Sequence, residues 1–196
     1  MSVAKEILPE DAPRLKELKH RQRVLRARKK IEAFVSFVFG WKLQEFQKHW
    51  HEFASKYNRA LIFAPQAHGK TSQMSLVRPL FILGQHPNRI LKIISCNDDK
   101  AVDILGTIAK LIESNKKLRE VFPDLKPAER GSWTKHQITI QRDVSAVDAS
   151  IEALGILSTG SGDRATDLMF DDPVDFRNAI LQPALRKMVI RAYTAT

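Results

Sequence analysis

The sequence predicts an α/β fold with three layers, a mainly parallel central sheet and additional helices at the N-terminus. Three observations predict it. The apolar run 60–63 is predicted to be a strand, which leads through a glycine-containing turn into the helix-like stretch 72–83. A second apolar run, 166–170, ends in two carboxylates and is stopped by Pro173. Further strand candidates alternate with a helical pattern between them, which is typical of a parallel sheet with covering helices.

Size and composition set the limits. With 196 residues, we expect residues 1–58 to form basic and amphipathic helices packed on a core built from residues 59–196. A hydrophobic content of 43% with 28% charged residues is that of a globular protein rather than a disordered one. The single cysteine, Cys96, excludes a disulfide framework within the chain. No apolar run approaches the ~18–20 residues of a membrane span, so no membrane partner is predicted.

The first predicted helix is strongly basic. Between Arg14 and Lys30 there are nine basic residues and one acid, Glu17, so this segment carries eight of the ten net positive charges. Pro13 suits a first helical turn. Two interpretations remain open: a helix that contacts DNA phosphates or a neighbouring subunit, or a solvated charged face. No aromatic side chain lies among the basic ones, so base stacking is not indicated.

The next segment, residues 41–57, predicts an amphipathic helix. Its spaced aromatic residues are typical of core contacts; they are Trp41, Phe46, Trp50 and Phe53. His49 and His51 are two positions apart and therefore point to different helix faces, so a metal-binding pair is not expected.

A phosphate-binding loop is predicted directly after residues 60–63. It comprises Ala64, Pro65, Gln66, Ala67, His68, Gly69, Lys70 and Thr71. Such a loop needs backbone N–H groups at a helix N-terminus, a lysine near the β- and γ-phosphates, and a hydroxyl that holds Mg²⁺. Gly69, Lys70 and Thr71 fill these roles, although Ala64 stands where the usual pattern has its first glycine. The alternative is a plain turn that opens a helix.

The second motif supplies two carboxylates at a strand end. We predict that Asp171 holds Mg²⁺ and that Asp172 orients or deprotonates the attacking water. An ordinary Asp-Pro turn would explain Asp172-Pro173, but it would not explain a second acid on the same strand. Together the two motifs predict an ATPase that uses ATP and Mg²⁺.

The interval between the motifs indicates the kind of ATPase. From Lys70 to Asp171 there are 101 residues, whereas small nucleotide kinases usually place the carboxylate strand soon after the loop. This spacing favours the additional-strand (ASCE) division of P-loop NTPases. A helix over 100–114, capped by Asn97 or Asp98, is also expected here. The intervening strand candidates are Ile90–Ser95, Gln137–Gln141 and Ile151–Leu157.

The run 157–164 is polar and glycine-rich. It is either a plain connecting loop or a mobile segment that presents Arg164 near the active face, seven residues before Asp171. Arg164 itself is either a catalytic cation or an arginine that is solvated or paired with Asp163.

Three stretches resemble the large terminase subunits of tailed bacteriophages, the motors that package DNA into capsids. They are residues 61–71, 115–133 and 160–173, and the resemblance extends over about residues 41–193. Many relatives carry an arginine just before His-Gly-Lys, where this chain has Ala67. The resemblance therefore implies that another arginine, for which Arg164 is the candidate, neutralises transition-state charge from a neighbouring subunit.

The resemblance also implies partners and a nucleotide contact. It implies double-stranded DNA, a portal protein and a small terminase subunit as partners, and a homo-oligomeric ring on the procapsid in the host cytoplasm. Motors of this kind read adenine with a glutamine ahead of the loop, which would be Gln47, with Gln44 competing for the role.

Related motors continue beyond a final helix, here 179–193, with a coupling strand and a nuclease domain. We therefore expect an N-terminal ATPase fragment without nuclease activity, monomeric on its own. The alternatives are a helicase-like or DNA-repair ATPase, and a nucleotide-dependent DNA-binding or assembly module with little turnover.

Overall fold

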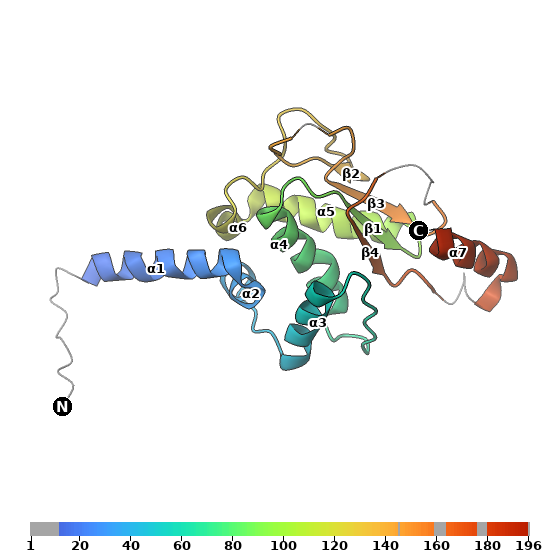
Figure 1. The fold of residues 1–196 in the computed structure, drawn as a ribbon, viewed down its shortest axis with the longest axis horizontal. Helices are drawn as coiled ribbons and strands as arrows, with labels where there is room; N and C mark the ends of the chain where they lie inside the picture. Colours follow the sequence, from blue (N-terminus) through green and yellow to red (C-terminus); the bar gives the residue numbers. More distant parts are fainter. Residues whose placement is uncertain (1–11, 145, 159–163, 176–179, 196) are drawn as a thin grey trace.

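The chain folds around a four-stranded sheet, seen in the computed structural model (Figure 1). The structure describes residues 12–144, 146–158, 164–175 and 180–195. The strand order is β2-β3-β1-β4; β1 pairs in parallel with both β3 and β4, and β2 pairs antiparallel with β3. The predicted α/β class with a mainly parallel sheet is therefore confirmed. The strands are β1 (Leu91–Ser95), β2 (Gln137–Ile138), β3 (Ile151–Gly155) and β4 (Asp167–Asp171).

Helices precede, connect and follow these strands. Helix α5 begins at Asp98, two residues before the predicted start, and Asn97 is its N-cap: the Asn97 side chain accepts a hydrogen bond from the backbone N–H of Lys100 at 2.9 Å. The helix α2 was not singled out from the sequence, since its apolar run is short; its polar residues Glu32 and Ser36 are one helical turn apart and lie on its exposed side. The helices are α1 (Ala12–Lys29), α2 (Ile31–Phe39), α3 (Glu45–Lys56), the π-helix η2 (Thr71–Val77), α4 (Arg78–Gln85), α5 (Asp98–Ser114), α6 (Lys116–Val121) and α7 (Pro183–Ala195).

The two faces of the sheet are covered unequally. One face carries Leu91 and Ile93, which belong to a large core cluster with side chains of α2, α4, α5 and α6. Phe34 of α2 lies within this cluster, with its ring 5.3 Å from that of Phe81 and 5.6 Å from that of Phe122. On the opposite face, Ile94 packs against Val189 of α7. The sheet therefore has helices on both faces, with a thicker layer on the side of α4 and α5.

An ion pair lies within the sheet. Lys92 of β1 and Glu152 of β3 are register partners, and the Lys92 Nζ lies 3.2 Å from a Glu152 carboxylate oxygen. Both side chains are largely buried, 8% and 15% exposed. Charged groups remain in such surroundings only when they are paired.

The strand predicted over residues 60–63 does not form. These residues pair with none of the described strands, and β4 is an edge of the described sheet. Leu61 and Phe63 are 68% and 87% exposed instead of buried. Alternating apolar residues favour a strand only when a neighbouring strand pairs with their backbone groups, so the prediction for this segment was wrong in the described fold.

Candidate functional site

The predicted phosphate loop has a backbone suited to anion binding. Ala67 and Gly69 both have left-handed conformations, with φ of 63° and 78°. A Cβ at Gly69 would lie 3.2 Å from the Gln47 Nε2, so glycine is favoured there by both conformation and space. The backbone N–H groups of residues 66–69 donate to no acceptor among the described residues. Unpaired amides in such a turn form a concave site for anions.

A pocket of about 290 Å³ lies over this loop. Its lining comprises residues 64–72 together with Asp172, which directly follows the last residue of β4. The two predicted motifs therefore meet at one concave surface. All of the loop residues assigned to nucleotide binding, from Ala64 to Thr71, line it.

Asp171 is held tightly at the end of β4. Its carboxylate accepts hydrogen bonds from the Thr71 hydroxyl at 3.0 and 3.1 Å and from the Ser75 hydroxyl at 3.0 Å. Its backbone carbonyl accepts a hydrogen bond from the Ser95 hydroxyl at 2.8 Å. The residue is only 7% exposed. The two predicted metal ligands, Thr71 and Asp171, are thus in direct contact.

Ser75 was missed by the sequence reasoning. It lies four residues after Thr71 in η2, on the same side of the helix, and both hydroxyls reach the same carboxylate. The i, i+4 spacing of two hydroxyl residues after the loop was the signal that could have revealed it. The π-helical winding of η2 is a feature often found at functional sites.

Asp172 faces the loop lysine. The Lys70 Nζ donates to an Asp172 carboxylate oxygen as an ion pair, and the Asp172 side chain is 59% exposed. Asp172 has a left-handed φ of 45°, a conformation that aspartate tolerates better than most non-glycine residues. The carboxylate predicted to act on water is therefore engaged by the lysine predicted to contact phosphate.

Gln47 braces the loop. Its Nε2 donates to the backbone carbonyl of His68 at 3.0 Å, while its Oε1 accepts from the backbone N–H of Gln44 at 3.0 Å. The Phe46 ring lies 5.7 Å from the His68 ring. Both ends of the Gln47 amide are thus already hydrogen-bonded. Adenine recognition by Gln47 stays a prediction, and it requires these bonds to be exchanged. Gln44 serves as the N-cap of α3.

Helix α3 is also fixed to the helix that follows the loop. The Arg78 guanidinium donates to the carbonyl of Ala54 at 2.7 Å and to that of His51 at 3.3 Å. His51 is 2% exposed, and its Nε2–H donates to the Gln73 Oε1 at 3.2 Å. Burial lowers the pKa of His51 to about 4, assisted by the nearby charge of Arg78 and opposed by the hydrogen bond to Gln73. His51 is therefore neutral at pH 7.

The first residue of α5, Asp98, holds the end of β3 and the start of the glycine-rich run. Asp98 accepts hydrogen bonds from the Gly155 N–H at 2.7 Å and from the Ser158 hydroxyl at 3.0 Å. Nearby, the pKa of Lys100 is raised, first by its hydrogen bond to the Cys96 thiol and further by the charges of Asp175 and Asp172.

Arg164 is not brought to the loop. It is exposed and makes no hydrogen bond or ion pair with the residues that the structure describes. Its alternative partner, Asp163, lies outside the described residues, as do residues 159–162. The structure therefore unites residues 64–71 with Asp171 and Asp172, with Gln47 behind them, and leaves Arg164 apart.

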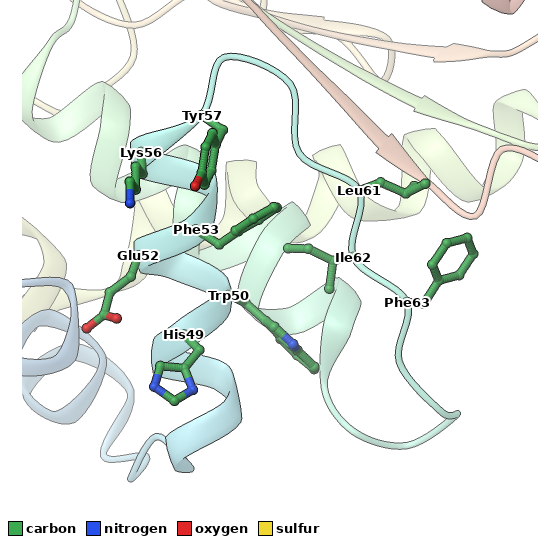
Figure 2. A pocket seen from close by; sticks show the side chains of 9 residues that line it. All are labelled: His49, Trp50, Glu52, Phe53, Lys56, Tyr57, Leu61, Ile62 and Phe63. Carbon is green, nitrogen blue, oxygen red and sulfur yellow. The ribbon is translucent and has the colours of Figure 1, made fainter.

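A second hollow of about 500 Å³ lies between α3 and residues 61–63 (Figure 2). Ile62 points toward Trp50 and Phe53 of α3, whereas Leu61 and Phe63 point away from that helix. This alternation is that of an extended chain, although the segment is unpaired.

The donor set suits Mg²⁺ more than a transition metal. No group of three or more His, Cys, Asp or Glu residues that could hold a metal occurs within the described part of the chain. Mg²⁺, however, is usually held by one or two carboxylates together with nucleotide phosphates and water. The Thr71 hydroxyl and Asp171 carboxylate supply oxygen donors of that kind side by side.

Among the helices described, none has the length and apolarity needed to cross a bilayer. A comparison of the chain with protein-family models and with curated proteins gives no match.

Proposed function

We propose that this chain binds ATP with Mg²⁺ and hydrolyses it. One observation carries the proposal: the loop residues Lys70 and Thr71 contact two consecutive carboxylates, Asp172 and Asp171, about a hundred positions later in the chain. A plain turn that opens a helix has no need for such an acid pair. A nucleotide phosphate site with a metal needs both.

Each group has a chemical role in this proposal. The free amides of residues 66–69 and the Lys70 ammonium bind the phosphates. Thr71 and Asp171 hold Mg²⁺, which when bound neutralises charge that develops on the phosphate oxygens. Ser75 and Ser95 keep Asp171 in position. Asp172, once released from Lys70, orients and deprotonates the attacking water.

The mechanical role that we propose is DNA packaging. The stretches that resemble large terminase subunits include both halves of the site, residues 61–71 and 160–173. In this reading ATP hydrolysis moves double-stranded DNA into a procapsid, within a homo-oligomeric ring that contacts a portal protein and a small terminase subunit in the host cytoplasm.

Nucleotide titration tests the first part. The protein is titrated with a fluorescent ATP analogue, with Mg²⁺ and with EDTA, and phosphate release is followed in parallel. We expect saturable binding that Mg²⁺ strengthens. Absence of binding at millimolar nucleotide would contradict the proposal. Protection of DNA from nuclease in the presence of procapsids, without strand separation on a forked duplex, distinguishes packaging from a helicase.

A second candidate is a nucleotide-dependent DNA-binding or assembly module with little turnover. The observation that favours it is the ion pair of Lys70 with Asp172, which occupies the carboxylate required for hydrolysis. Tight ATP binding without phosphate release, in the assembled complex as well as in the isolated chain, would support this candidate over a motor.

A further inference from the structure

Helix α1 presents an unusually dense positive surface. It carries five arginines and three lysines against one acid, Glu17, and Lys30 follows its last residue. Apart from the buried Ala27 and the half-buried Leu15 and Val24, its described side chains are exposed. A helix that is polar on nearly all sides buries little apolar surface and is stabilised little by packing, so its many basic residues suggest a role other than folding.

The second half of α1 anchors it to the body. Ala27 is fully buried and Val24 packs on the core cluster. The Arg28 Nε donates to the backbone carbonyl of Val121 at 2.6 Å, and Arg23 lies 5.7 Å from the centre of the Phe37 ring. The N-terminal end of α1 instead runs away from the sheet and its covering helices (Figure 1).

Acidic side chains do not neutralise this surface. The one carboxylate contact of α1 among the described residues is between His20 and Glu120, at 2.9 Å. The arginines and lysines of α1 are all exposed, and none has a carboxylate partner in the described part of the chain. Apart from Arg23 and Arg28, they are Arg14, Lys16, Lys19, Arg21, Arg26 and Lys29.

A neighbouring element adds to the charge. Helix α6 packs against α1 through the contact of Glu120 with His20, in the middle of α1, and the contact of Val121 with Arg28, near its end. It carries Lys116, Lys117 and Arg119, all exposed. Two segments about a hundred residues apart in sequence thus place cations in one region, which a solvated face of a single helix does not require.

We propose that α1, together with the basic residues of α6, binds the phosphate backbone of duplex nucleic acid. The 18 residues of α1 span about 27 Å, a length over which a duplex presents about 16 phosphate charges. A helix is also narrow enough for the major groove, which is about 12 Å wide. The proposal concerns a surface distinct from the nucleotide loop and requires no nucleotide.

Other polyanionic partners fit this helix less well. A single strand would be held by aromatic stacking, and α1 contains no Phe, Tyr or Trp. A bilayer surface needs a continuous apolar face, whereas the exposed large apolar side chains of α1 are Leu18 and Leu25, two turns apart. An acidic protein partner is usually fixed by buried aromatic or aliphatic anchors, for which these two leucines alone are few.

Salt-dependent binding tests the proposal. A fluorescein-labelled 30-base-pair duplex of mixed sequence is titrated with the full chain, without nucleotide, at several salt concentrations. The variant combines Arg14→Gln, Lys16→Gln, Lys19→Gln and Arg21→Gln, all exposed and all within residues 14–21 of α1. We expect at least a ~10-fold loss of affinity and a shallower salt slope, by about 2 to 4 in log–log units.

The matched control removes the same charge elsewhere. It combines Lys110→Gln, Lys126→Gln, Arg130→Gln and Lys135→Gln, all exposed and outside α1 and α6. We expect less than a threefold change, because the site would be intact. Equal losses in both variants, or none in the α1 variant, would overturn the proposal.

Three further measurements distinguish duplex nucleic acid from other polyanionic partners of α1. Equal affinity for a single strand of the same length would overturn the duplex assignment. So would equally effective competition by polyglutamate, or binding to phosphatidylserine vesicles as tight as to the duplex. We expect the α1 variant to bind ATP as the wild type does. If the wild-type chain bound the duplex but did not bind ATP, that result would count against the ATPase proposal alone.

Discussion

The Thr71 hydroxyl donates to both carboxylate oxygens of Asp171, at 3.0 and 3.1 Å, although the two residues are 100 positions apart. The contact joins the first residue of η2 to the last residue of β4. A displacement of η2 would therefore also displace the Asp171 carboxylate at the end of β4. The following predictions depend on this connection and on its neighbours.

Lys70→Ala should weaken ATP binding by roughly 10- to 100-fold, since one charge-assisted contact to phosphate is lost. The fold should be retained, because the Lys70 side chain is partly exposed and has Asp172 as its ion-pair partner on the surface. Fluorescent-nucleotide titration and a thermal melt measure the two effects. Lys110→Ala, an exposed lysine of α5, is the control; wild-type affinity in Lys70→Ala would remove Lys70 from the site.

Substitution of the two carboxylates should have different effects on binding and hydrolysis. Asp171→Asn should weaken Mg²⁺-dependent nucleotide binding, because the metal loses a charged ligand. Asp172→Asn should bind Mg²⁺-ATP at least as well as wild type and lose hydrolysis, because Lys70 is released while the water activator is missing. Titrations with and without EDTA, beside phosphate release, separate the two. Equal loss of affinity in both variants would refute this division of roles.

Arg164→Ala should lower ATP turnover in the assembled ring by ~10³-fold or more while leaving ATP affinity nearly unchanged, if Arg164 serves a neighbouring subunit. Arg164 is exposed and makes no contact with the loop among the described residues, which is compatible with such a role. Mixed rings of Arg164→Ala and Lys70→Ala subunits should recover activity. Normal turnover of the single variant would exclude Arg164 from the mechanism.

Acid should destabilise the fold through His51. Its pKa is about 4 in the folded state and near 6.5 when unfolded, so between these values the unfolded chain binds more protons. The free energy of unfolding should be flat from above pH 6.5 and should fall as pH drops toward 4, by up to about 3 kcal/mol from this residue. Urea unfolding at pH 7.0, 5.5 and 4.5 measures it.

His51→Gln should be less stable at pH 7 and should show a smaller drop between pH 7 and 4.5. The exposed His49 on the same helix provides the control, since His49→Gln should keep the wild-type pH dependence. An unchanged pH dependence in His51→Gln would show that other groups cause the acid effect.

The proximity of the two motifs could be predicted from the sequence. Lys70 and Thr71 contact Asp172 and Asp171, as expected from their residue types and from their places at the ends of a helix and a strand. Position 60–63 was misjudged because an apolar run becomes a strand only when another strand pairs with it.

Tertiary contacts account for the other omissions. The contacts of Ser75 with Asp171 and of Gln47 with His68 depend on how helices dock, which a single sequence does not display. Helix α2 is nine residues long and mostly apolar, and a short apolar run of this kind cannot be distinguished from a buried strand by its pattern alone.

The ion pair between Lys92 and Glu152 has a consequence for how the sheet assembles. If β3 were offset by one residue relative to β1, the Glu152 side chain would lie on the other face of the sheet from Lys92, and the two charges would no longer meet. Leaving an uncompensated charge in such a buried position costs about 3 to 5 kcal/mol. Misaligned pairings of these two strands are therefore disfavoured during folding. Because β1 also pairs with β4, a correctly aligned β1 and β3 help to position the strand that ends in Asp171.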